Sequence, residues 1–85
     1  MTPTFAYQDV AARAVAALRN LFGPDAGIYP EEGYGGRVRV KVVSPRLNGK
    51  AESEKQDLIW QALRDSLQAD AQAVAFVIGY GTDEL

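Results

Sequence analysis

The segment from Arg37 to Leu63 constrains the fold most, because a strand pattern passes into a helix pattern with only a short connection between them. From Arg37 to Val42 basic and apolar residues alternate strictly, so one face carries valines and the other carries cations. Such alternation is typical of a strand with one buried face and one face in water. The segment therefore predicts a sheet that is covered on a single side.

The connection carries its own capping signals. Ser44-Pro45 predicts a short turn over Arg46 and Leu47, with the serine as cap and the proline in the first helical position. Ser53 and Gln56 have the S-x-x-Q spacing of a capping box, in which each side chain satisfies a free amide. A helix is therefore predicted from Lys55 to Leu67. Its expected buried stripe consists of Ile59, Ala62, Leu63 and Ser66, flanked by Leu58 and Leu67.

One shoulder of this helix carries Gln56, Trp60 and Arg64 at four-residue spacing. A tryptophan in such a place is either a peripheral core residue or an anchor for a partner, and tryptophans are enriched at such anchors. Gln56 has a structural interpretation as the capping residue and a functional one as part of a binding site. The shoulder is expected to be half exposed.

The first helix is predicted over Val10 to Phe22, where apolar residues recur at three- and four-residue spacing. Gly23-Pro24 ends it, because the proline cannot continue the hydrogen-bond ladder. A short edge strand is predicted from Ala26 to Tyr29, ending at Pro30. Glu31 to Gly36 is then expected to form a flexible hairpin loop.

The last strand is predicted over Ala73 to Tyr80, a run that is apolar on both faces and should be fully covered and paired through its middle. Gly81 to Leu85 is polar and is expected to fray. Because strand-helix-strand crossovers are right-handed, this strand should run parallel to Arg37–Ser44. The fold class predicted is α+β, a two-layer α-β-β-α-β domain in which the helices cover one face of a three-stranded mixed sheet.

Composition excludes several classes of chemistry. The chain has 85 residues with no cysteine and no histidine, which removes disulfides, thiolate and imidazole catalysis and the usual ligands of zinc, copper or iron. Its 11 carboxylates form no spacing typical of paired acid-base catalysis. We expect a single domain over residues 1–85 that is not an enzyme and needs no cofactor. The start Met1–Thr4 has no basic region followed by an apolar run, and no later apolar run is long enough to span a membrane, so we expect a cytoplasmic protein.

Two motifs carry a resemblance. Val43–Lys50, VSPRLNGK, matches V-S-x-x-F-x-G-K with leucine in place of phenylalanine, and Leu58–Leu63, LIWQAL, matches an apolar-apolar-aromatic run followed by leucine. In these motifs and their separation the chain resembles the BolA-like family. The likeness extends to the first helix, the final strand and Thr82-Asp83-Glu84. It implies a fold similar to a type II KH domain.

The functional residues of the family differ here. Where the BolA-like pattern has R-H-R, this chain has Lys55-Gln56-Asp57, so Gln56 replaces the histidine that helps hold an iron-sulfur cluster shared with a monothiol glutaredoxin. The loop Glu31–Gly36, where the family has a second cysteine or histidine ligand, offers neither. The resemblance therefore allows a glutaredoxin-like partner but no cluster ligation by this chain.

The function predicted is that of a non-catalytic binding or regulatory module with a protein partner. Its expected partner-binding residues are Arg46, Lys50, Lys55, Gln56, Trp60 and Arg64.

The alternative is a weak nucleic-acid-binding KH-like domain that uses the turn Arg46–Lys55 with the basic strand face of Arg37, Arg39 and Lys41. A net charge of -2 opposes a general basic field, and Asn48–Ala51 lacks the second glycine of a G-x-x-G loop. The three strand cations also suit an ordinary solvated face.

Overall fold

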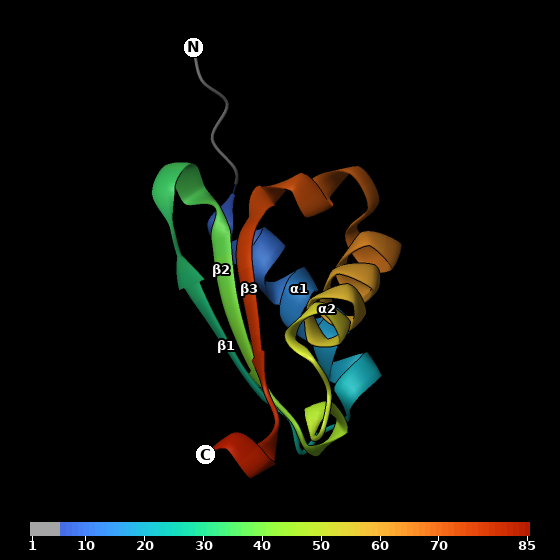
Figure 1. The fold of residues 1–85 in the computed structure, drawn as a ribbon. Helices are drawn as coiled ribbons and strands as arrows, with labels where there is room; N and C mark the ends of the chain where they lie inside the picture. The colour runs from blue at the N-terminus through green and yellow to red at the C-terminus, as the bar shows by residue number, and fades with distance from the viewer. Residues whose placement is uncertain (1–5) are drawn as a thin grey trace.

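A computed structural model describes residues 6–85; the irregular lead predicted over Met1–Phe5 lies outside this range. Its elements follow the order α1 (Tyr7–Phe22), β1 (Gly27–Glu32), β2 (Val38–Val43), α2 (Glu52–Leu67) and β3 (Val74–Tyr80), with short 3-10 turns between them. Figure 1 shows both helices on one side of the sheet, while no α-helix of residues 6–85 lies on the other side. The predicted two-layer α+β fold with a three-stranded mixed sheet is confirmed. No helix within residues 6–85 combines the length and the apolar character that crossing a membrane requires.

The strand order is β1-β2-β3, with β1 antiparallel and β3 parallel to β2. The parallel crossover agrees with prediction, and β2 is the central strand. The expectation that Ala73–Tyr80 is covered on both faces is therefore wrong, and Phe76 is 47% exposed. Because the helices cover only one face of the sheet, alternate residues of β3 have to lie on the uncovered face.

A bulge in β3 decides which residues face outward. Val38 pairs with Val74, yet Arg39 pairs with Phe76, so Ala75 has no partner in β2. One inserted residue reverses the alternation on its own strand. Phe76 consequently lies on the open face, opposite the face to which strict alternation from Val74 would assign it.

β1 is longer than predicted. The pairing runs from Gly27 opposite Val43 to Glu32 opposite Val38, and Pro30 lies within it opposite Val40. An edge strand tolerates a proline because one side of its backbone needs no partner. The connection to β2 is therefore shorter than the predicted loop and contains only the 3-10 turn Tyr34–Gly36 and its two flanking residues.

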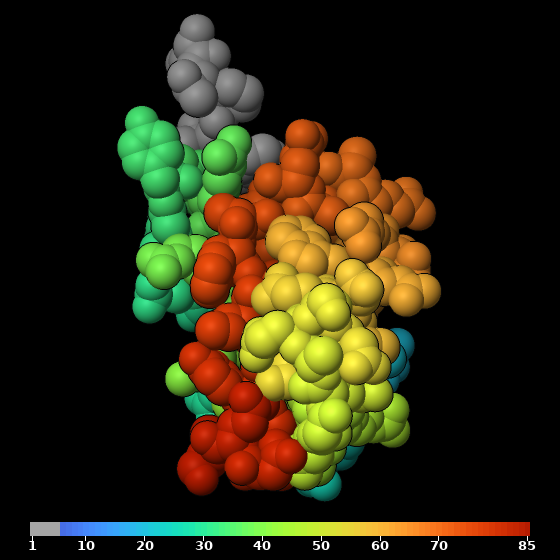
Figure 2. Space-filling view, in the orientation of Figure 1, coloured from blue at the N-terminus to red at the C-terminus, as the bar shows by residue number. Residues whose placement is uncertain are grey.

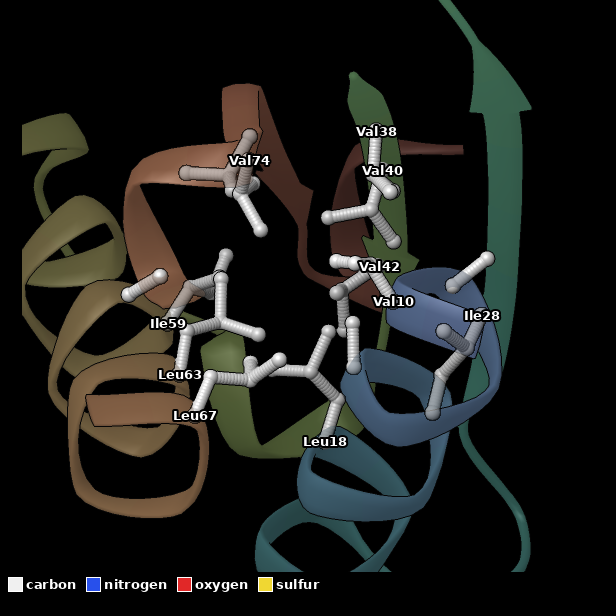
Figure 3. Close-up of a cluster of buried hydrophobic side chains, with 14 of the residues drawn as sticks. Val10, Leu18, Ile28, Val38, Val40, Val42, Ile59, Leu63, Leu67 and Val74 are labelled. Carbon is white, nitrogen blue, oxygen red and sulfur yellow. The ribbon is translucent and has the colours of Figure 1, made fainter. Parts of the chain in front are cut away.

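The valine face of β2 packs against both helices. Val38, Val40 and Val42 are at most 2% exposed and face Leu18 of α1 and side chains of α2 (Figure 3). Along α2 the buried residues are Lys55, Ile59, Leu63 and Leu67. The predicted stripe is correct for Ile59 and Leu63 and wrong for Ser66, which is exposed.

Of the two predicted caps, the one at Ser44 forms and the one at Ser53 does not. Ser44 Oγ accepts a hydrogen bond from the Arg46 amide at 3.1 Å, as predicted. The long helix, however, begins at Glu52, and the amide of Ala51 donates to Glu54 Oε1 at 3.2 Å. Glu54 is therefore the residue whose side chain accepts from the amide at the start of the helix. The capping box predicted between Ser53 and Gln56 does not form.

Candidate functional site

Lys55 is buried by the fold. Its side chain is 4% exposed, and its ammonium pairs with Glu52 at 3.2 Å and with Glu84 of the chain's last turn. The hydrogen bond that the Lys55 ammonium donates to Glu84 is the largest cause that raises the pKa of Lys55 above its ordinary value, so the side chain stays charged. Lys55 was predicted to contact a partner, but its ammonium already has two carboxylate partners inside this chain.

The C-terminal turn, Thr82–Glu84, explains that burial. Asn48 Nδ2 donates to Thr82 Oγ1 at 3.0 Å, and the Gly49 amide donates to Asp83 Oδ2 at 3.1 Å. Figure 2 shows the red C-terminal turn packed against the yellow start of α2. The prediction that this tail frays is wrong, because these side chains tie it to the segment that precedes α2.

Gln56 lies between α2 and β3. Its Nε2 donates a hydrogen bond to the carbonyl oxygen of Val77 at 2.8 Å, and the side chain is half-buried. The amide therefore satisfies a backbone acceptor of an outer strand instead of capping its own helix. This contact gives Gln56 a structural role that its sequence spacing did not indicate.

Gln56→Ala is expected to lower the free energy of unfolding by about 1 kcal/mol, because Val77 loses one hydrogen-bond donor. Gln56→Glu should cost more than Gln56→Ala, since a carboxylate cannot donate and repels the carbonyl oxygen. Urea unfolding followed by the fluorescence of Trp60, the single tryptophan, measures both. Equal stability of Gln56→Glu and the wild type would contradict the contact.

Trp60 and Arg64 continue the same shoulder of α2. Trp60 is partly buried and packs against the edge of the core, whereas Arg64 is exposed. The half-exposed character predicted for this shoulder is confirmed. Since Gln56 contacts β3, the shoulder lies on the β3 side of the helix.

Arg46 and Lys50 lie on the opposite side of α2. They border a groove between α1 and α2 whose floor contains Leu21 and Leu58. The groove continues along α2 to Asp65, about two helical turns beyond Leu58. Within residues 6–85 neither Arg46 nor Lys50 takes part in an ion pair. The two hollows share Leu21 and Leu58, and we call them together the helix groove.

The predicted partner surface is therefore divided among three places. Arg46 and Lys50 belong to the helix groove, Lys55 to a buried ion-pair cluster, and the other three residues to the shoulder beside β3. Sequence spacing placed all six residues near one turn and one helix. It could not show on which side of α2 each of them would lie relative to α1 and β3.

A second surface combines residues that sequence analysis did not connect. On the open face of the sheet, Tyr29 lies beside Lys41 and Phe76 lies beside Arg39. Alternation along β2 indicated that Arg39 and Lys41 lie on the open face of the sheet. Only the strand pairing brings the aromatic rings next to them. We call Tyr29, Glu31, Arg39, Lys41, Phe76 and Ile78 the sheet face.

The described part of the chain contains no group of three or more carboxylates that could hold a metal ion. No known protein family, curated protein or solved structure matches the chain.

Proposed function

We propose that this chain is a non-catalytic binding module that holds a segment of a partner protein in the helix groove. The observation that carries the proposal is the charge pattern of the groove. Leu21 and Leu58 are half-buried in its floor, while Arg46 and Lys50 at one end lack ion-pair partners within residues 6–85. Asp65 stands near the other end.

An amphipathic segment of a partner fits these features. Its apolar side chains would cover Leu21 and Leu58, as in complexes where a helix lies in a hydrophobic groove. Its acidic residues would face Arg46 and Lys50, and a basic residue at the other end would face Asp65. Complementary charges at both ends fix the direction of the bound segment, because the reversed orientation brings like charges together.

The resemblance to the BolA-like family, with its type II KH-like fold, supports a binding or regulatory role and makes a monothiol glutaredoxin a candidate partner. This chain would bind it without ligating an iron-sulfur cluster, because it contains no thiolate or imidazole donor. We also propose that the protein is located in the cytoplasm.

Affinity capture from the source cell tests the groove with three baits: wild type, Arg46→Glu/Lys50→Glu, and Arg64→Glu. Arg64 is exposed on the other side of α2, so its charge reversal is the matched control. A partner of the helix groove should be retained by wild type and Arg64→Glu. The double variant should bind at least about tenfold more weakly when the purified pair is titrated, because its reversed charges repel the acidic residues.

The opposite result would refute the groove assignment. A partner lost by Arg64→Glu and retained by Arg46→Glu/Lys50→Glu would place the binding surface on the Trp60 shoulder. Circular dichroism of the three baits establishes that each variant is folded. Both groove cations lie outside the buried core, so neither reversal should disturb the fold.

A further inference from the structure

The sheet face forms two cross-strand rows that the helices do not cover. Strand pairing aligns Tyr29 with Lys41 and Ile78 in one row, and Glu31 with Arg39 and Phe76 in the next. A shallow depression runs across these rows. Aromatic side chains thus lie on the outer strands β1 and β3, and cations lie on the central strand between them.

Both rings are accessible. Tyr29 is 55% exposed and Phe76 is 47% exposed. A Cβ atom at Gly27 would come within 2.7 Å of the Tyr29 hydroxyl, so the phenol ring extends back along its own strand over a position without a side chain. Gly27 therefore lets this ring lie low on the sheet, as a stacking platform requires.

The cations are held close to the rings. Lys41 Nζ lies over the Tyr29 ring, 5.1 Å from its centre, and Arg39 Cζ lies over the Phe76 ring, 5.7 Å from its centre. Arg39 also pairs with Glu31 at 3.3 Å, but both side chains are more than half exposed. An exposed pair of this kind contributes little, so a phosphate can displace the glutamate.

The spacing of the rings restricts the ligand. Two strand intervals of about 4.8 Å and one two-residue step of about 6.6 Å separate Tyr29 from Phe76, so their Cα atoms lie about 12 Å apart. Neighbouring stacked bases are only about 3.4 Å apart along a strand. Bases on the two rings would therefore have to be unstacked from each other, which a single strand allows and a duplex does not.

We propose that the sheet face binds single-stranded nucleic acid, with bases stacked on Tyr29 and Phe76 and the linking phosphates against Arg39 and Lys41. Aromatic side chains beside cations are the combination that single strands use, because every base has a stacking face and every linkage has a charge. An acidic peptide would satisfy the cations but would leave the two rings unused. This site lies on the face opposite the helices and does not depend on the helix groove.

Fluorescence anisotropy with a labelled oligothymidylate of about ten nucleotides tests the proposal. The wild type should bind, and log K should fall against log salt with a slope of about 1.4 for two phosphates on a single strand, measured between about 50 and 200 mM salt. A duplex of the same length should bind more weakly. Arg39→Gln/Lys41→Gln should remove most of the salt dependence.

Substitutions of the rings separate stacking from charge. Phe76→Leu and Tyr29→Leu keep an apolar side chain at an exposed position, and each should weaken binding about tenfold. Glu31→Gln should strengthen binding, because it removes the competitor for Arg39. Arg64→Gln, on the helix layer, serves as the control and should bind like the wild type.

Three results would overturn the proposal. The first is that the wild type gives no anisotropy change at about 50 mM salt. The second is equal affinity for the duplex and the single strand, and the third is full binding by both leucine variants. In the third case, competition by a polyglutamate peptide would show that the face recognises acidic peptides through charge alone. None of these results bears on the helix groove, so the two proposals fail independently.

Discussion

Leu63→Ala is expected to lower the free energy of unfolding by about 2–5 kcal/mol. Leu63 is completely buried and lies among the side chains that fill the space between α2, Leu18 of α1 and the valines of β2 (Figure 3). Truncation leaves a cavity that these packed neighbours fill only in part. A chain of this length has a total stability of about 4–13 kcal/mol, so this one change removes a large share of it.

Leu58→Ala provides the matched control. It deletes the same atoms from the same helix, but Leu58 is only half-buried and borders the helix groove. Urea unfolding followed by Trp60 fluorescence should show a clearly smaller loss for Leu58→Ala. Equal losses at the two positions would mean that α2 does not present Leu63 to the core.

Glu84→Ala is expected to lower the Tm by several degrees. It removes the carboxylate that pairs with Lys55 and also accepts from the Gly81 amide at 2.8 Å. The Lys55 ammonium then keeps Glu52 as its one carboxylate partner, and removing a partner from a buried charge is unfavourable. Glu84→Gln should lose less than Glu84→Ala, because an amide oxygen still accepts hydrogen bonds.

Lys55→Met separates the buried charge from the buried side chain. It keeps an unbranched apolar side chain and leaves a carboxylate at Glu84 that is partly exposed to water. Lys55→Met should therefore cost less than Glu84→Ala. Asp57→Ala, an exposed acidic position of α2, controls for the change of net charge. A larger loss for Asp57→Ala than for Glu84→Ala would contradict the proposed role of the ion pair.

The same pair predicts a dependence of stability on pH. The hydrogen bond from Lys55 lowers the pKa of Glu84 below 4.5. The stability that Glu84 contributes is therefore complete above pH 4.5 and is lost as pH falls through the lowered pKa. Donating this hydrogen bond to Glu84 raises the pKa of Lys55 above 10.5, so the stability that Lys55 contributes is complete below pH 10.5 and is lost as pH rises through the raised pKa. Thermal unfolding of Glu84→Gln should show a weaker acid dependence than the wild type.

Several local features could be predicted from the sequence because their signals lie within a few residues of each other. The alternation of β2 identified its buried valines, and Ser44 was correctly assigned as a cap. Gly23 ends α1 with a φ of 90°, a conformation that glycine adopts without the cost a side chain would add. Together with the right-handed crossover rule, these signals were enough to predict the two-layer fold.

The predictions that failed depend on which distant segments meet. Two residues with polar side chains show this. Lys55 was interpreted as a surface cation, but the C-terminal turn 29 residues away supplies the carboxylate that makes its burial possible. Gln56 was assigned to a helix cap, but its hydrogen-bond partner belongs to β3. Periodicity shows that a residue lies on a given helix face, but not which element covers that face.

By itself, the sequence determined the order of the elements and the one-sided burial of β2, because periodicity and capping act through neighbours along the chain. Only the tertiary structure decided that β3 is an outer strand and that the bulge at Ala75 directs Phe76 to the open face. A one-residue shift in register moves a side chain from one face of the sheet to the other. The sheet face exists because of that shift, together with the pairing that sets Tyr29 beside Lys41.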